Sequence, residues 1–188
     1  MTRRACTLWP LAFVALGLGC KPKLSPTEFE RISSEACECS IEKPGRALRL
    51  DKIVKDVDLA YGDLRTELSV GVSAVLREDL EDLSLREFAD FMVEAMRDDP
   101  DVVTDEIKGC DELEVDGRPA LICGITGELT HMGLVKTPKR LLAVVISVDR
   151  TPEGSALARR IFGSLRSTEP PLSADAVIDS TDGEDETL

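Results

Sequence analysis

Asp116 and Gly117 fix the geometry at the middle of the chain. Both residues tolerate a positive φ angle, which the tightest two-residue turns between antiparallel strands require. The segments on either side, 102–115 and 118–129, have the composition of strands. The sequence therefore predicts a long β-hairpin, and any fold of this chain has to contain that antiparallel pair.

The register of this hairpin places two cysteines opposite each other. Around a two-residue turn at Asp116-Gly117, facing residues have numbers that sum to 233, and Cys110 and Cys123 meet this condition. Counting outward from the turn, they form a non-hydrogen-bonded pair, the type with the closer side chains. Pro119 falls at another such site, where its missing N–H removes no ladder bond. We expect a Cys110–Cys123 disulfide, and two neighbouring buried thiols are the alternative.

The remaining periodic segments predict two more strands and two helices. Strands are expected at 69–76, which is rich in valine, and within 139–149, whose unbroken apolar run is typical of a strand covered on both faces. Ser84 and Glu87 form a capping box at the start of an amphipathic helix, and 154–166 has the pattern of a second one. The predicted fold class is α+β: a largely antiparallel sheet flanked by two amphipathic helices, an α/β/α sandwich.

The beginning of the chain has the pattern of an export signal. Arg3 and Arg4 are followed by an uncharged, mostly apolar run over 8–19. Twelve residues are too few to span a bilayer, which needs about 20. The pattern favours a removable signal peptide over residues 1–19.

The end of that run, Ala15-Leu16-Gly17-Leu18-Gly19-Cys20, resembles the lipobox of bacterial lipoproteins. The resemblance implies that Cys20 is acylated and becomes the first residue of the mature protein. Acyl chains on Cys20 would hold the protein at a membrane. Lys21 follows the cysteine, which in a Gram-negative source implies sorting to the outer membrane. The expected location is the cell envelope, after export.

The chain divides by composition into four parts. After the signal, residues 20–45 are expected to be an anchor and linker with a short helix starting near Pro26. Residues 46–167 are the predicted sandwich domain. The rest, 168–188, has seven acids and no bases and is predicted to be a disordered tail.

Charge and residue content exclude several classes of function. The formal net charge is −13, so a nucleic-acid partner is not expected because its phosphates would be repelled. The single histidine, His131, is predicted to lie in a surface loop, and no serine-nucleophile or phosphate-binding motif is present. The chain is therefore predicted to be a non-enzyme with no catalytic residues, no metal site and no cofactor.

Two further cysteines, Cys37 and Cys39, are harder to interpret. Residues two apart rarely satisfy disulfide geometry with each other, so each is expected to bond elsewhere in the fold. A redox pair or a metal pair is the alternative. A structural zinc site needs more ligands than two thiolates and one histidine distant in sequence.

The order of predicted elements over roughly 46–167, with the hairpin sequence Val115-Asp116-Gly117-Arg118-Pro119-Ala120, resembles the PsbP-like α/β/α sandwich superfamily. That resemblance implies a non-enzymatic module that binds other proteins or assists their assembly. The leading hypothesis is an envelope lipoprotein with an interaction domain and an unidentified protein partner. The competing hypothesis is a periplasmic thiol-redox or metal-binding protein that uses Cys37 and Cys39.

Overall fold

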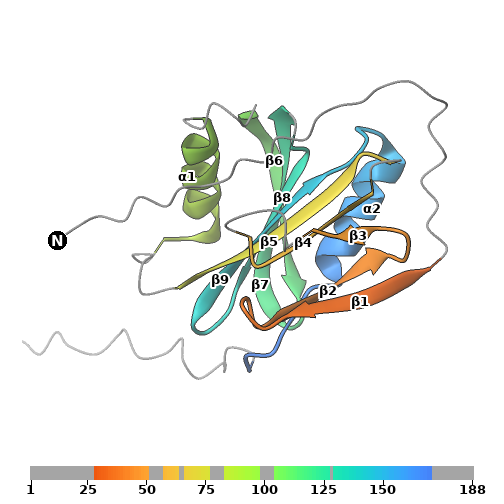
Figure 1. Cartoon of the computed structure of the whole chain (residues 1–188). Helices are drawn as coiled ribbons and strands as arrows, with labels where there is room; N and C mark the ends of the chain where they lie inside the picture. The colour runs from red at the N-terminus through yellow and green to blue at the C-terminus, as the bar shows by residue number, and fades with distance from the viewer. Residues whose placement is uncertain are drawn as a thin grey trace, which may run out of the picture.

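The computed structural model of the protein describes residues 28–50, 57–63, 66–76, 83–97, 104–127 and 129–170. Their elements in chain order are β1 (Phe29–Ser34), β2 (Cys39–Pro44), β3 (Leu48–Arg49), β4 (Leu59–Asp63), β5 (Leu68–Leu76), α1 (Leu85–Arg97), β6 (Thr104–Val115), β7 (Arg118–Gly127), β8 (His131–Lys136), β9 (Arg140–Ser147), α2 (Pro152–Gly163) and β10 (Arg166–Ser167). Figure 1 shows α1 and α2 on opposite sides of the main sheet. The predicted α+β class with two helices is confirmed, although sheet outweighs helix.

The main sheet has seven strands in the order β3-β4-β5-β9-β8-β7-β6, and every pairing in it is antiparallel. Its two faces carry separate cores because side chains alternate along a strand. In β9, Leu142, Val144 and Ile146 belong to the cluster that contains α2. The intervening Leu141, Ala143 and Val145 belong to the cluster that contains α1. The unbroken apolar run of β9 is thus explained by burial on both faces, as the sequence predicts.

A smaller sheet of β1, β2 and β10 lies beside the α2 core. Its central strand, β2, contributes Ile41, which is fully buried in that core. The two sheets are joined by Tyr61 of β4, whose hydroxyl donates to the carbonyl oxygen of Glu42 at 2.9 Å. Burial raises the pKa of Tyr61, so this donor stays protonated. The smaller sheet is therefore fixed to the main one through a buried hydrogen bond.

Both helices begin at capped positions. The hydroxyl of Ser84 accepts from the amide of Glu87, and the Glu87 carboxylate accepts from the Ser84 amide at 2.9 Å, which confirms the capping box. The Ser84 hydroxyl also donates to the Glu87 carboxylate at 2.7 Å, and this hydrogen bond, followed by the one from the Ser84 amide, lowers the pKa of Glu87. The second helix starts at Pro152, two residues before the predicted position, because Thr151 is its cap and accepts from Gly154 at 3.0 Å.

The predicted register of the central hairpin is confirmed. Val115 faces Arg118, and the pairing continues without a shift to Cys110 opposite Cys123. Asp116 and Gly117 both have positive φ angles, 55° and 70°. The register shifts only beyond Gly109, on the far side of the cysteines from the turn. The Cα atoms of Cys110 and Cys123 lie 4.0 Å apart, and a disulfide joins them.

Part of segment 20–45 differs from the prediction. Where a short helix starting near Pro26 was expected, residues 29–34 form a strand, and Pro26 itself lies outside the described residues. Pairing with β2 satisfies the backbone of β1, and the Arg160 guanidinium lies 3.6 Å above the ring of Phe29. Residues 29–44 thus belong to the folded domain and are not a linker, because tertiary contacts outweigh a local capping signal.

The structure also corrects the expected positions of His131 and of the start of the predicted tail. His131 is not in a loop: it begins β8, which lies between β7 and β9 in the main sheet. Thr168 and Glu169 are fixed to the domain, and Glu169 is buried, so the first residues of the predicted tail are ordered. The predicted signal peptide over 1–19, Cys20 and residues 171–188 lie outside the described residues.

Candidate functional site

The turn between β1 and β2 holds the most unusual chemistry in the described structure. Cys37 and Cys39 are bonded to each other, with Cα atoms 5.2 Å apart. The expectation that each would bond elsewhere is therefore wrong. Glu38 explains the difference: its φ angle of 48° lies in the left-handed region, and this conformation folds the chain back so that its two neighbours approach.

The disulfide is buried under an exposed turn. Each cysteine is 1% exposed and belongs to the α2 core, whereas Glu35 and Ala36 are exposed. The Sγ atom of Cys37 lies 3.7 Å from the carbonyl oxygen of Ser34. A reagent therefore reaches the two sulfur atoms only when the turn opens.

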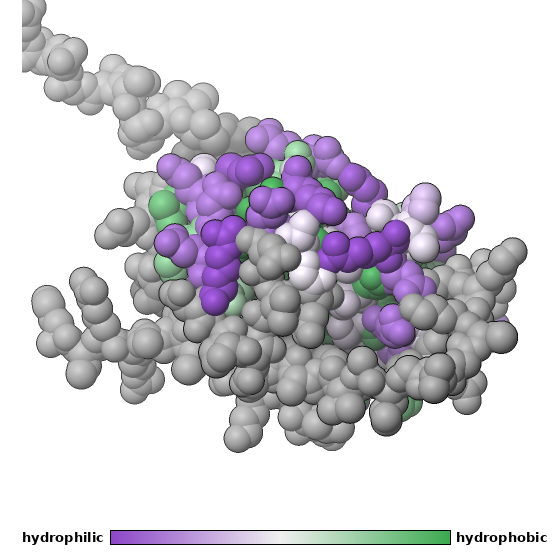
Figure 2. Space-filling view, turned by 90° about the horizontal axis from the view of Figure 1, so that it is seen from above, coloured by the Kyte–Doolittle hydropathy of each residue, from purple (hydrophilic) through white to green (hydrophobic). Residues whose placement is uncertain are grey.

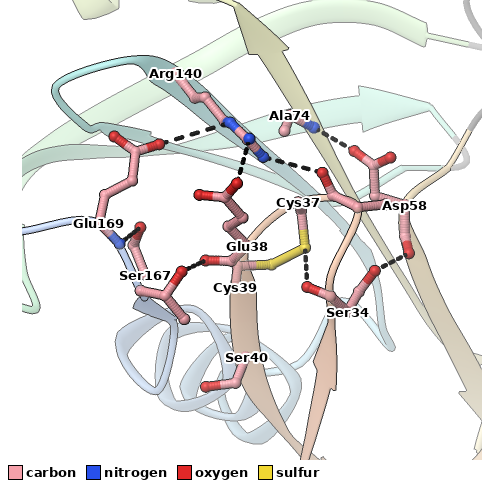
Figure 3. Close-up of a disulfide and its surroundings, with 12 residues drawn as sticks. Ser34, Cys37, Glu38, Cys39, Ser40, Asp58, Ala74, Arg140, Ser167 and Glu169 are labelled. Carbon is pink, nitrogen blue, oxygen red and sulfur yellow. Dashed lines mark hydrogen bonds and ion pairs between the residues drawn. A yellow bond between two sulfur atoms is a disulfide. The ribbon is translucent and has the colours of Figure 1, made fainter.

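Ser34 and Asp58 fix the base of the turn to the main sheet (Figure 3). The hydroxyl of Ser34 donates to the carbonyl oxygen of Asp58 at 2.7 Å. The carboxylate of Asp58 in turn accepts from the amide of Ala74, in β5, at 2.7 Å. The side of the turn nearest Cys37 is thus held by hydrogen bonds to the edge of the sheet.

Arg140, the first residue of β9, holds the turn from the other side (Figure 3). Its guanidinium donates to the carbonyl oxygen of Ala36 at 3.0 Å and to Oε1 of Glu38 at 2.7 Å. Its Nε lies 3.6 Å from Oε1 of Glu169. One cation therefore joins the turn to the end of the domain.

Residues 166–169, near the end of the last described range, form what we call the C-terminal strap. The amide and hydroxyl of Thr168 both donate to the carbonyl oxygen of Glu38, at 2.9 and 3.1 Å. Ser167 pairs with Cys39 in the smaller sheet. The carboxylate of Glu169 accepts from the amide of Lys139 at 2.9 Å. The strap thus contacts both the disulfide turn and the β8–β9 turn.

A buried arginine at the central hairpin completes the strap's attachment. Arg118 is 2% exposed and donates to the carbonyl oxygens of Asp116, at 2.8 Å, and of Glu169. The carboxylate of Asp116 pairs with Arg118 and accepts from the amide of Ser167 at 3.1 Å. A buried charge is tolerated only when it is paired, so Asp116 is required both for the turn and for Arg118.

The other candidate residues are not brought to this site. Cys110 and Cys123 belong to the α1 core on the opposite face of the main sheet. His131 is half-buried, and burial, with smaller contributions from Arg159 and Arg150, lowers its pKa. Within the described ranges, no group of three or more His, Cys, Asp or Glu residues is arranged to hold a metal ion.

The sequence does not reveal Arg140, Thr168 or Glu169 as partners of the disulfide turn. Each lies more than 100 residues from Glu38 along the chain, and no local motif marks it. Glu169 was moreover counted among the acids of the predicted tail. Within the residues that the structure describes, neither α1 nor α2 is long and apolar enough to cross a bilayer.

Comparisons with known proteins identify the fold. No family model and no curated protein sequence matches the chain. The solution structure of the cyanobacterial PsbP protein CyanoP from Synechocystis is similar, with a TM-score of 0.57 at 15% identity, over 80% of this chain and 98% of that one. The Ran-binding protein Mog1p from Saccharomyces cerevisiae has a TM-score of 0.52 at 12% identity, over 76% of this chain and 96% of that one. The predicted resemblance to the PsbP-like fold is thus confirmed, and it concerns the fold alone.

Proposed function

We propose that this chain is a membrane-anchored envelope lipoprotein whose folded domain is a non-catalytic protein-interaction or assembly module. The observation that carries the interaction part is the fold, because one of its structural neighbours is a Ran-binding protein. The lipoprotein part is supported by the sequence that ends at Cys20. The two parts are tested separately.

The spacing between Cys20 and the domain suits a tethered module. The first described residue, Glu28, is eight residues after Cys20. Fully extended, those residues reach about 26–29 Å, at 3.3–3.6 Å per residue. Acylation at Cys20 would therefore keep the domain within roughly its own diameter of the membrane. A partner would be met at or beside that membrane.

The surface favours a polar or charged interface. Among the described residues visible from above in Figure 2, hydrophilic ones predominate and hydrophobic ones are scattered. The chain carries 36 acidic against 23 basic residues, so a basic partner surface is the electrostatically complementary one. This supports a partner recognised through charge.

The test of the anchor is the mass of the amino-terminal peptide of the mature protein, isolated from membranes of a Gram-negative host. We expect Cys20 to carry the acyl chains and the Cys20→Ser variant to leave the membrane fraction. Cys6→Ser is the matched control, because it removes a cysteine from the signal and leaves the lipobox intact. An unacylated mature chain that begins at another residue contradicts the proposal.

The interaction part is tested by photo-crosslinking in the same host. A photoreactive residue replaces Phe91, which is 52% exposed on α1. We expect one crosslinked species of defined mass, identified by mass spectrometry, that is lost in competition with the unlabelled purified chain. Buried Val144, which is 0% exposed, is the matched negative position. If no crosslinked partner is found at any exposed position tested, the chain is not an interaction module.

A periplasmic thiol-redox protein is the second candidate, and the Cys37–Cys39 bond is the observation that favours it. The metal-binding version is not supported, because sulfur atoms bonded to each other are not thiolate ligands. Replacing both cysteines by serine discriminates between the candidates. Loss of the cellular function with folding preserved favours the thiol-redox protein, whereas an unchanged function favours the interaction module.

A further inference from the structure

The two disulfides among the described residues constrain the chain to different degrees. Cys110–Cys123 links residues 13 apart across two paired strands, whereas Cys37–Cys39 links residues only two apart. A link over so short a loop removes little chain entropy from the unfolded state. It also holds Glu38 in the left-handed region, which costs free energy for a residue with a side chain. Cys37–Cys39 thus contributes little to the stability of the fold, and its contacts indicate another role.

The contacts of the disulfide turn converge on the C-terminal strap. The carbonyl oxygen of Glu38 receives both hydrogen bonds from Thr168, and Oε1 of Glu38 receives one from Arg140. Cys39 pairs with Ser167 in the smaller sheet. The residue between the two cysteines, Glu38, is therefore the same residue that holds the strap.

We propose that Cys37–Cys39 is a redox latch: its reduction by an external dithiol relaxes Glu38 and detaches Thr168 of the C-terminal strap from the disulfide turn. Two thiol sulfurs cannot stay at bonding distance, so Cys37 and Cys39 must move apart when the bond is broken. Glu38 then returns to a negative φ, which turns its carbonyl oxygen away from Thr168.

The chemical step is thiol–disulfide exchange. A thiolate of the dithiol attacks one sulfur of the Cys37–Cys39 bond and forms a mixed disulfide, and the other cysteine leaves as a thiolate and takes up a proton. The second thiol of the reagent then attacks the mixed disulfide and releases the remaining cysteine. The dithiol is oxidised by two electrons to its own disulfide, and Cys37 and Cys39 are reduced to two thiols. Because both sulfur atoms are buried, the turn must open before this reaction can occur.

The inference deepens the thiol-redox candidate but does not depend on acylation or on a partner, because every readout is made on the purified full chain. The chain is equilibrated with increasing dithiothreitol, free thiols are alkylated, and peptides containing each cysteine are quantified by mass spectrometry. We expect Cys37–Cys39 to be half reduced at a dithiothreitol concentration about tenfold lower than the one that half reduces Cys110–Cys123. A tenfold difference lies within the range found when two equilibria are coupled. Equal midpoints, or earlier reduction of Cys110–Cys123, overturn the latch.

Hydrogen exchange tests the release itself. On reduction, we expect the amide of Thr168, which donates to Glu38, to exchange about tenfold faster, while the Ser167 amide, which donates to Asp116, and those of β8 are unchanged. The Cys37→Ser/Cys39→Ser variant should reproduce this pattern in oxidised protein, and Cys110→Ser/Cys123→Ser is the matched control that should not. If the Cys37→Ser/Cys39→Ser variant does not fold, the exchange measured on the wild-type chain in dithiothreitol provides the test. Unchanged exchange at Thr168 after Cys37–Cys39 is reduced overturns the latch.

The coupling must also act from the strap to the disulfide. If the bonded disulfide favours the attached strap, weakening the strap must favour the reduced turn by the same factor. Thr168→Val keeps the side-chain shape and removes only the hydroxyl's hydrogen bond to Glu38. We expect it to lower the dithiothreitol midpoint of Cys37–Cys39 and to leave that of Cys110–Cys123 in place. An unchanged Cys37–Cys39 midpoint contradicts the coupling.

Discussion

Gly133 shows how closely a single residue of the main sheet is packed. A Cβ atom at this position would overlap with the ring of Phe162, which is fully buried on α2. Gly133→Ala should therefore lower the free energy of unfolding by about 1–3 kcal/mol, because the ring has no room to move. Chemical denaturation measures the change. Gly124→Ala is the matched control, since nothing lies within 4 Å of its added Cβ, and an equal loss in both variants would contradict the explanation.

His131 gives the domain a pH dependence of known sign. Burial, and then Arg159 and Arg150, lower the pKa of His131 in the folded protein. The unfolded chain therefore binds more protons near its ordinary pKa of about 6.5, and stability falls as pH is lowered through that value. We expect His131→Gln to flatten the pH dependence of the unfolding free energy between about pH 7 and pH 5. A variant with the wild-type slope would show that His131 is not its source.

At the scale of single residues, the sequence predicts what depends on neighbours along the chain. Cys110 and Cys123 face each other because a two-residue turn determines the pairing that follows from it. The partners of Glu38 could not be found in that way. Arg140 and Thr168 reach it only after two sheets have assembled, so no spacing or local pattern encodes their contacts.

The start of α1 is an element whose stability depends on one side chain. The hydroxyl of Ser84 accepts from the Glu87 amide at 3.2 Å, an amide that otherwise has no partner within the helix. Ser84→Ala should cost about 1 kcal/mol of unfolding free energy, the usual loss for an N-cap. Ser84→Asp, which retains an acceptor at the cap, should recover most of it. Equal destabilisation by alanine and aspartate would exclude capping as the cause.

At the scale of elements, periodicity over a long segment predicts better than a short signal. The two helices, β5, β9 and the central hairpin each have a pattern sustained over eight or more residues, and each is present. The signal near Pro26 is only four residues long, and β1 stands immediately after it. β8 was missed because His131 and Gly133 break its apolar pattern, although Met132, Leu134 and Val135 are buried.

At the scale of the whole molecule, three turns distant in sequence meet at the C-terminal strap. The strap contacts Glu38 in the β1–β2 turn, Asp116 and Arg118 at the β6–β7 turn, and Lys139 and Arg140 at the β8–β9 turn. The local sequence predicts the β6–β7 turn and the strand that follows the β8–β9 turn, but no local pattern indicates that these turns meet. The predicted boundary at residue 167 divides the strap, because composition changes there while the buried contacts continue to Glu169.

The strap predicts how truncation affects the domain. Ending the chain after Pro170 should leave the unfolding free energy within about 0.5 kcal/mol of wild type, because the removed acidic segment cannot bury enough apolar surface to stabilise a fold. Ending it after Leu165 removes Glu169, which accepts from buried Arg118 and pairs with Arg140. We expect a loss of about 1–3 kcal/mol, because the buried Arg118 guanidinium loses a hydrogen-bond acceptor while it keeps its ion pair with Asp116. Thermal unfolding of the two truncated chains makes the comparison, and equal midpoints would mean that the strap rests on the domain without stabilising it.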